Sequence, residues 1–353
     1  QQLVAAFKPL RFDLLWQDYV KFVFLIGASA AAIIALLNKK IRAGGFGTVL
    51  IAILLVDLFI IDTRFVNPKP AQRLEENFQP DATVAYLKQQ QGLFRVFPVG
   101  QDLFMDNTFA YHGLHSVGGY SPAKLKIYQT MLDSCMYKGP DPAFPLNMNM
   151  VNMLNVKYLV TEFEFPDGRF QTVNADQARR RFVLANPYAL PRAFFVGKTV
   201  LAQNQTEVFA ALNSTQFNAG TMAVIEKPLP QQITEPDSFS AEVTGYKSRS
   251  ITIKAYTDSS ALLVLSEIYY PAGWRAYIDG NEAEIFKTNY VLRSVVVPAG
   301  PHEVTFTFDP PMYNAGWNLS HAAWAVAALC ILIGLWKLPA LRARFGGKKA
   351  EQA

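Results

Sequence analysis

Three uninterrupted apolar segments constrain the fold of this chain more than any other feature of its sequence. They cover residues 22–37, 46–61 and 319–335, and charged side chains are almost absent from them. At ~1.5 Å of rise per residue, each segment as a helix comes close to the ~30 Å thickness of a bilayer core. We therefore predict three transmembrane helices. The alternative, in which the first two segments form a buried hairpin of a soluble core, fits their length and low charge less well.

Basic residues next to these segments predict the orientation of the chain. Three lie between the first two segments and five follow the third: Lys39, Lys40, Arg42, Lys337, Arg342, Arg344, Lys348 and Lys349. If each segment crosses once, both groups fall on the same side of the membrane, and the positive-inside rule identifies that side as the cytoplasm. Residues 62–318 are then predicted to face outward.

The net charge of +5 does not indicate binding to nucleic acid. Residues 62–318 contain 22 Lys and Arg against 24 Asp and Glu, so the positive surplus lies beside the apolar segments. There it is explained by membrane topology, and the bilayer is the expected partner. Asp57, inside the second segment, leaves two interpretations open. It is either a functional intramembrane group or a side chain that reaches the outer headgroup region from near the end of the helix.

The outward part begins with a pattern of mixed helices and strands, which predicts an α/β domain over residues 63–230. A helix is expected over 80–91, with Asp81 as N-cap and Gly92 at its end, followed by a strand over 94–99. After a long loop at 100–122, Pro122 is predicted to open a second helix. A helix that leads into a strand at 157–161, and the segments "RAFFVG" and "TMAVIE" on either side of a helix at 205–213, complete the alternation.

From residue 231 the pattern changes to strands alone. Five segments alternate or run apolar between turn residues: "SITIKAY", "ALLVLSEIYY", "GWRAYID", "VLRSVVV" and "HEVTFTFDP". Asp279-Gly280 supplies the positive φ angles of a tight hairpin. We predict a β-sandwich over 231–310, close to a final transmembrane helix and basic cytoplasmic tail at 311–353. Residues 1–62 hold the first two transmembrane helices and their basic loop.

The loop at 100–122 is the first candidate for ligand binding. It gathers polar and aromatic side chains among glycines, and such side chains can hydrogen-bond and stack on a sugar. The candidates are Asp102, Asp106, Asn107, Tyr111, His112, His115 and Tyr120. Three interpretations stay open: contact with a sugar or acceptor, a structural turn with ordinary exposed histidines, and a metal site at the HxxH pair. The flanking glycines argue against the helix that would place both histidines on one metal.

Trp274 is the second candidate, with Tyr269, Tyr270 and Tyr277 close by. An aromatic ring on a β-sandwich can stack on a sugar, but Trp274 also shares one strand face with Ala276 and Ile278. Contact with substrate and a place in the core are therefore both open interpretations.

No familiar catalytic motif is present, and we assign no catalytic residue. The two cysteines, Cys135 in the polar middle and Cys330 in the third apolar segment, are not expected to form a disulfide. Their surroundings lack the Cys/His spacing of a metal site. We expect neither a metal nor a cofactor.

Several segments, in order along nearly the whole chain, resemble the C-terminal end of the bacterial membrane protein YfhO family. They are "LLVDLFIIDTRFV", "VGGYSPAKLKIYQ", "MLNVKYLVT", "LPRAFFV", "LVLSEIYYPAGWRAYIDG" and "NYVLRSVVVPAGPHEVTFTFDP". Members of this family are large multi-span proteins, similar to GT-C glycosyltransferases that use polyprenyl-phosphate sugars. Their characterised relatives add sugars to cell-surface polymers such as teichoic acids.

The resemblance implies that this chain is the C-terminal part of a membrane glycosyltransferase of the bacterial cytoplasmic (inner) membrane. A polyprenyl-phosphate sugar and a cell-surface glycopolymer are then the implied partners. The N-terminal spans and the first outward loop, where GT-C enzymes carry acidic catalytic residues, are not part of this sequence, so the fragment alone is expected to be inactive. The alternative is a non-catalytic outward module that binds envelope glycans or proteins.

Overall fold

The fold was analysed in a computed structural model that describes residues 2–66, 70, 78–139, 146–163 and 168–346. The chain divides into two compact units, Gln1–Gln79 and Pro80–Ala353.

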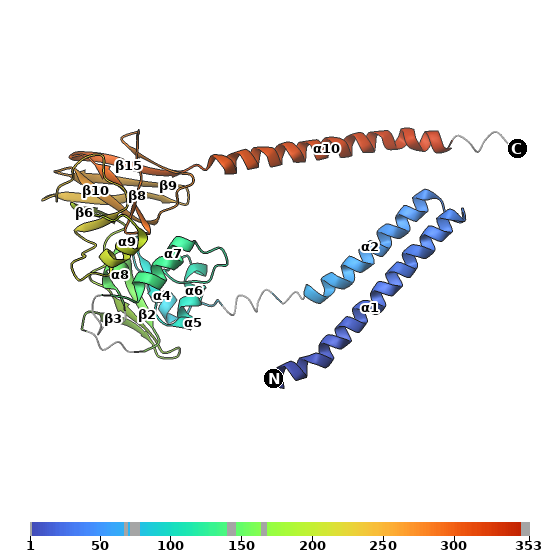
Figure 1. The fold of residues 1–353 in the computed structure, drawn as a ribbon, viewed down its shortest axis with the longest axis horizontal. Coiled ribbons are helices and arrows are strands. Elements are labelled where there is room, and N and C mark those ends of the chain that lie inside the picture. The colour runs from blue at the N-terminus through green and yellow to red at the C-terminus, as the bar shows by residue number, and fades with distance from the viewer. Residues whose placement is uncertain (1, 67–69, 71–77, 140–145, 164–167, 347–353) are drawn as a thin grey trace. The chain divides into compact units, whose positions relative to one another are not determined.

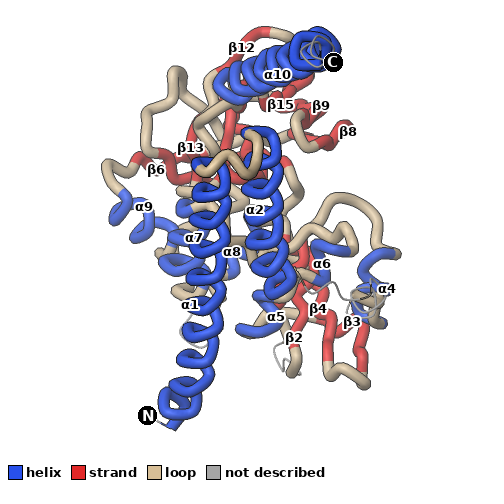
Figure 2. The backbone as a smooth tube through the Cα atoms, turned by 90° about the vertical axis from the view of Figure 1, so that its right-hand side faces the viewer, coloured by secondary structure: helices blue, strands red, loops and turns tan. Residues whose placement is uncertain are grey.

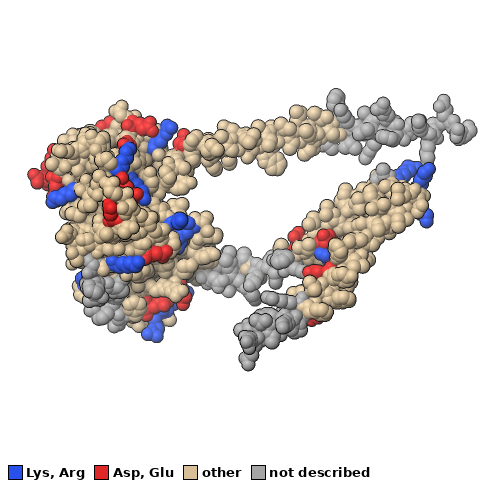
Figure 3. Space-filling view, in the orientation of Figure 1, with Lys and Arg blue, Asp and Glu red and all other residues tan. Residues whose placement is uncertain are grey.

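The first unit is a helical hairpin formed by α1 (Gln2–Leu37) and α2 (Ala43–Phe65). Their apolar spans run over Phe12–Leu37 and Gly44–Thr63, and almost none of these residues is buried inside the protein. Long apolar helices with exposed side chains are suited to lipid. Figure 3 shows few charged side chains on this hairpin, and they lie in small groups.

Asp57, the charged residue inside the second apolar segment, forms an ion pair within this hairpin. Its Oδ1 lies 2.8 Å from Lys21 Nζ on α1. Pairing is the usual way to reduce the cost of an ionisable group at membrane depth. The contact therefore explains Asp57 as a link between the two helices.

The third apolar span, Pro311–Gly334, belongs to α10 (Pro311–Gly346) and contains no Asp, Glu, Lys or Arg. All three helices are long and apolar enough to cross a membrane. The predicted combination of three such helices with an α/β and β-rich part is confirmed. The first and third spans begin about two to three turns before the predicted positions, because the helices continue through aromatic residues that the strict apolar limits left out.

The second unit begins with sheet A and short helices around it. Sheet A has the strand order β1-β2-β4-β3, with β1 and β2 parallel. Helix α4 begins as predicted, since Asp81 Oδ1 accepts a 2.7 Å hydrogen bond from Val84 N–H. The bounds are α4 Ala82–Lys88, β1 Arg95–Pro98, β2 Val156–Thr161, β3 Gln171–Asp176 and β4 Arg181–Ala185.

The segment predicted as a plain loop at 100–122 contains two short helices, α5 (Gln101–Met105) and α6 (Thr108–Tyr111). Asp106 separates them, and its Oδ1 accepts bonds from the N–H and the hydroxyl of Thr108. The next helix begins at Lys126 rather than at Pro122, because Leu125 occupies the extended N-cap position. The remaining helical bounds are α7 Lys126–Met131, the π-helical turn η1 Leu132–Met136, α8 Met148–Met153 and α9 Gln205–Leu212.

Two larger sheets complete the unit. Sheet B has the order β5-β10-β14-β13-β7-β6, and sheet C has the order β12-β11-β15-β9-β8. Figure 2 shows β15, β9 and β8 of sheet C next to one another. The bounds are β5 Ala193–Val196, β6 Lys198–Leu201, β7 Met222–Ile225, β8 Phe239–Lys247, β9 Ser250–Thr257, β10 Ala261–Ile268, β11 Trp274–Ile278, β12 Asn281–Ala283, β13 Phe286–Thr288, β14 Leu292–Val297 and β15 Gly300–Phe308.

Sheets B and C pack through a shared core, in which Leu263 and Val295 of sheet B meet Ile253 and Phe306 of sheet C. The other face of β10 packs Leu262 and Val264 into a second core with helices α7 to α9. These helices lie between sheets A and B (Figure 1). This burial on both faces explains why the β10 sequence is a continuous apolar run. The β9 sequence alternates because only one of its faces is buried.

Strands from both sides of residue 230 take part in sheet B. β5, β6 and β7 precede that residue, whereas β10, β13 and β14 follow it. The predicted hairpin between β11 and β12 has positive φ at Asp279 (52°) and Gly280 (83°), as the sequence indicated.

Candidate functional site

A buried group of charged side chains lies where the three sheets approach one another. We call it the arginine cluster, and it centres on Glu267 near the end of β10. Glu267 Oε1 accepts hydrogen bonds from Arg95 Nη2 and Arg192 Nη1, each at 3.2 Å, and from the Tyr246 hydroxyl at 2.9 Å. Arg95 begins β1, Arg192 precedes β5, and Tyr246 lies on β8. One carboxylate oxygen therefore ties together sheets A, B and C.

Ser266 fixes the position of Arg95 in this cluster. Its Oγ accepts a 2.9 Å bond from Arg95 Nη1 and donates a 2.7 Å bond to the carbonyl of Met153. The same Arg95 nitrogen donates to the carbonyl of Leu154. With Glu267 as well, the Arg95 guanidinium has three partners from two segments of the chain, which hold it in one orientation.

His115 joins the arginine cluster from the predicted candidate loop. Its Nδ1 lies 3.1 Å from Arg192 Nη2, which has protons to donate, so Nδ1 acts as the acceptor. Burial, followed by the charges of Arg192 and Arg95, lowers the pKa of His115. Burial also lowers the pKa of Arg192, to about 10, which still leaves its guanidinium charged near neutral pH. The pair is thus a neutral imidazole and a cation.

Arg293 adds a third guanidinium nearby, and its surroundings are unusual. The side chain is buried and lies with Cζ 3.9 Å from the centre of the Trp274 ring. Among the residues that the structure describes, its Nε and Nη1 have no hydrogen-bond partner. Burial lowers the pKa of Arg293 to about 10, and Glu267 is the main opposing charge. Three guanidinium groups therefore share one nearby carboxylate, which leaves this region with excess positive charge.

A cavity of about 290 Å³, which we call the loop pocket, opens at Arg95. Its polar side chains are Arg95, Ser116, Ser121, Lys124 and Tyr128, and no acidic residue is found among its lining within the described chain. The rest of the lining is glycine or apolar: Val117, Gly118, Gly119, Leu125, Leu154 and Ile268.

Several contacts hold the wall of the loop pocket in place. The Asn107 side chain bonds both the N–H (2.9 Å) and the carbonyl (3.1 Å) of Tyr120. The Tyr128 hydroxyl donates a 2.6 Å bond to the carbonyl of Val117. At Gly118 a Cβ atom would lie 2.5 Å from the carbonyl oxygen of Phe104, so glycine is required for this close approach. The loop is therefore a fixed wall.

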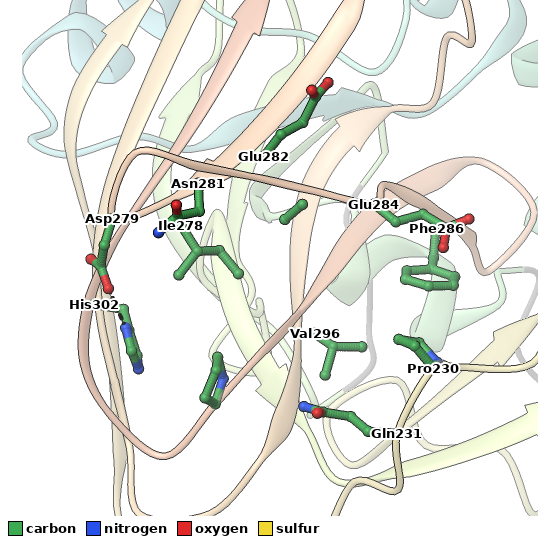
Figure 4. Close-up of a pocket in the computed structure, with 12 residues that line it drawn as sticks. Pro230, Gln231, Ile278, Asp279, Asn281, Glu282, Glu284, Phe286, Val296 and His302 are labelled. Carbon is green, nitrogen blue, oxygen red and sulfur yellow. Dashed lines mark hydrogen bonds and ion pairs between the residues drawn. The ribbon is translucent and has the colours of Figure 1, made fainter.

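A larger cavity of about 460 Å³, the sheet-edge pocket, lies at the edge of sheets B and C. Figure 4 shows Asp279 and His302 side by side at one end, and Glu284 and Phe286 at the other. His302 Nδ1 lies 2.6 Å from Asp279 Oδ2, and this bond is the main cause that lowers the pKa of Asp279. Apolar side chains form part of the lining, and acidic and amide side chains form the rest: Ile278, Phe286, Val296, Asp279, Asn281, Glu282, Glu284 and Gln231.

The sequence-based candidates in the loop have different positions. Asp106 is structural, because it accepts bonds from Thr108 and lies 3.6 Å from Arg181 Nη2. Asn107 holds the loop, whereas the side chains of Asp102, Tyr111 and Tyr120 are exposed.

Both histidines of this loop line a cavity of about 300 Å³ together with Lys88 and Gln90. His115 also belongs to the arginine cluster. Over the described residues, no group of three His, Cys, Asp or Glu side chains could hold a metal ion.

Trp274, the candidate on the β-rich part, has one ring face over the Arg293 guanidinium. It also packs against Phe308, with ring centres 5.2 Å apart. Trp274 and Arg293 both line a cavity of about 260 Å³ together with Tyr269 and Tyr270. The ring is thus partly structural and partly open to a cavity.

Sequence reasoning missed the charged residues that organise the site. Arg192, Glu267 and Arg293 all lie in or beside apolar strands, within "LPRAFFV", "LVLSEI" and "VLRSVVV". A charge between residues that are buried on both sides has to be paired or stacked. That signal identifies each residue, although it does not identify its partner.

Three membrane-type helices and a folded unit with α/β and β-rich layers define the class: an integral membrane protein with a substantial extramembrane part. The family model described as bacterial membrane protein YfhO matches residues 226–320, from the end of β7 into α10. This match confirms the predicted resemblance to the YfhO family over that part of the chain. No curated protein and no solved structure matches the chain.

Proposed function

We propose that this chain is the C-terminal part of a glycosyltransferase-like membrane protein that modifies cell-envelope glycopolymers with sugar from a polyprenyl-phosphate donor. In this proposal the unit Pro80–Ala353 binds the saccharide of the acceptor. The family match supports the class of protein. The sheet-edge pocket is the observation that supports a role in saccharide binding.

The lining of the sheet-edge pocket suits a saccharide for a simple chemical reason. A sugar ring has an apolar face and hydroxyl groups that both donate and accept hydrogen bonds. Ile278, Phe286 and Val296 offer an apolar surface, while Asn281 and Glu284 offer amide and carboxylate groups. A volume of about 460 Å³ lies within the range of small-molecule sites.

Binding of acceptor fragments to the purified full chain in detergent tests this role. Asn281→Ala and Glu284→Gln should each weaken binding of an envelope-type oligosaccharide by about five- to tenfold, since the first removes an amide group and the second replaces a charged acceptor by a weaker neutral one. Glu242→Gln is the matched control, because Glu242 is an exposed residue of β8 that does not line the pocket. Equal affinity in all four proteins would contradict the proposal.

The outward orientation of residues 62–318 belongs to the same proposal, and cysteine labelling tests it. Cys330 is exposed on α10 and is replaced by serine, whereas Cys135 stays, because it is buried and burial raises its pKa to about 12. A cysteine at the exposed Ser248 should then react with a membrane-impermeant thiol reagent in intact cells. Labelling that requires lysis would reverse the orientation.

The second candidate function is a non-catalytic outward module that binds envelope glycans or proteins. The same pocket supports it, since binding does not require catalysis. Sugar transfer by the full-length gene product, lost when its upstream part is deleted, would favour the glycosyltransferase. Undiminished glycan modification in cells without the gene product would favour the binding module.

A further inference from the structure

We propose that the loop pocket binds the phosphate group of a phosphate ester, at a site distinct from the sheet-edge pocket. The two cavities share no lining residue. The inference rests on the charge of the loop pocket, its free hydroxyl donors and its fixed wall. It goes beyond the proposed saccharide role and does not depend on it.

The charge of the loop pocket is the first argument. Arg95 and Lys124 line it, and no carboxylate does so within the described part of the chain. Arg95 shares Glu267 with Arg192, so one negative charge compensates two positive ones. The hydrogen-bond partner of Lys124 Nζ is the neutral Gln129 Oε1 at 3.2 Å. An anion in this cavity would therefore meet a surplus of positive charge.

Two serine hydroxyls supply neutral donors. Ser116 Oγ accepts the N–H of Gly118, and Ser121 Oγ accepts the N–H of Ala123. Each hydroxyl is thus held by a bond that it accepts, and its own proton has no acceptor among the residues described by the structure. Hydroxyl donors next to Arg and Lys are a suitable combination for phosphate oxygens.

The shape of the cavity favours an ester over a free ion. Its volume of about 290 Å³ exceeds the space that one phosphate group fills, and the remaining lining includes Leu125, Leu154 and Ile268. An organic substituent can lie against these side chains while its phosphate faces the cations. The bond from Asn107 to Tyr120 and the close approach at Gly118 hold the wall before a ligand arrives.

Calorimetric titration of the full chain in detergent with sn-glycerol 3-phosphate tests the proposal. Lys124→Gln should weaken binding by about tenfold, since it removes one charged contact. Lys126→Gln is the matched control, because Lys126 is an exposed lysine two residues further along, at the start of α7, and does not line the pocket. Ser121→Ala should weaken binding by about threefold, and glycerol should not bind at this site. Binding that is absent, or equally affected by both lysine substitutions, would overturn the proposal.

The source of the phosphate ester is distinguished by the membrane used. The titration is repeated in nanodiscs with and without phosphatidylglycerol. If phosphatidylglycerol competes with glycerol 3-phosphate for the wild-type protein but not for Lys124→Gln, the natural ligand is a lipid headgroup. Unchanged affinity with and without phosphatidylglycerol would identify a soluble or polymeric ester. Each result supports the phosphate site. Saccharide affinity, measured in the same Lys124→Gln protein, should stay at the wild-type value, so failure of one site is separable from failure of the other.

Discussion

The loop pocket and the sheet-edge pocket belong to the same folded unit, yet their charged linings are opposite. Arg95 and Lys124 line the first, whereas Asp279, Glu282 and Glu284 line the second. The difference follows from position. The loop pocket lies beside the arginine cluster, where Arg95 and Arg192 share Glu267, and the sheet-edge pocket lies at the end of two packed sheets.

One folded unit therefore offers two chemically distinct surfaces, either to one ligand or to two. A cationic cavity with hydroxyl donors favours an anion, and an acidic cavity with an apolar surface favours a neutral polyol. The two preferences can be tested separately because the cavities have no lining residue in common.

The largest expected effect comes from Glu267, which compensates the cations behind the loop pocket. Glu267→Ala should lower the free energy of unfolding by about 3–5 kcal/mol, because it leaves Arg95 and Arg192 without their carboxylate. Urea unfolding of the detergent-solubilised chain measures the change. Glu242→Ala, at an exposed position of sheet C, should stay within about 0.5 kcal/mol. Similar values for both variants would mean that the cluster does not stabilise the fold.

Charge reversal at Lys124 should separate the two pockets most sharply. Lys124→Glu places a carboxylate in the loop pocket, and like-charge contact should weaken glycerol 3-phosphate binding by about 100-fold. Saccharide binding at the sheet-edge pocket should not change. Parallel titrations with both ligands give the two affinities, and a loss of both would point to general unfolding or to a single shared site.

A smaller effect is expected from the side chain that holds the loop wall. Asn107→Ala removes both bonds to Tyr120 and should reduce the free energy of unfolding by about 1 kcal/mol, with about a fivefold loss of phosphate affinity. Asn281→Ala is the reciprocal control, since Asn281 lines only the sheet-edge pocket of the two. Unaltered phosphate affinity in Asn107→Ala would show that the loop does not need this bond for binding.

The smallest effect concerns the pH dependence of stability at His115. Its pKa in the folded protein is lowered below the ordinary value of 6.5, so the unfolded chain binds a proton more readily. The stabilising contribution of neutral His115 is therefore full above about pH 7 and is lost as the pH falls through 6.5 toward the folded-state pKa. His115→Gln should show a shallower fall in Tm between pH 7.5 and 5.5. An identical slope would rule out a role for this imidazole.

Much of the fold could be predicted from sequence because the relevant signals are local. The helix cap at Asp81, the hairpin turn at Asp279-Gly280 and the alternating strand at β9 each depend on a few neighbouring residues. The short helices α5 and α6 were not predicted from the sequence. Their polar, glycine-bearing segment lacks the apolar periodicity that indicates a helix.

The candidate site was only partly predictable. The segment at 100–122 does supply a wall of the loop pocket, but through Ser116, Gly118 and Ser121 rather than through its predicted histidines and aspartates. His115 and Trp274 lie instead against Arg192 and Arg293. A side chain's type indicates what chemistry it can perform, whereas its neighbours decide which chemistry is left available.

The sequence by itself determined the three apolar spans, the basic residues beside them and the change from mixed to all-β structure. Each is a property of a short continuous segment, and the hydropathy of such a segment does not depend on the rest of the fold. Only the tertiary structure brought Arg95 to Glu267, 172 positions apart in the chain, and joined strands from both sides of residue 230 in sheet B. Contacts at that separation depend on how whole sheets pack, because burial of their apolar faces outweighs any local preference.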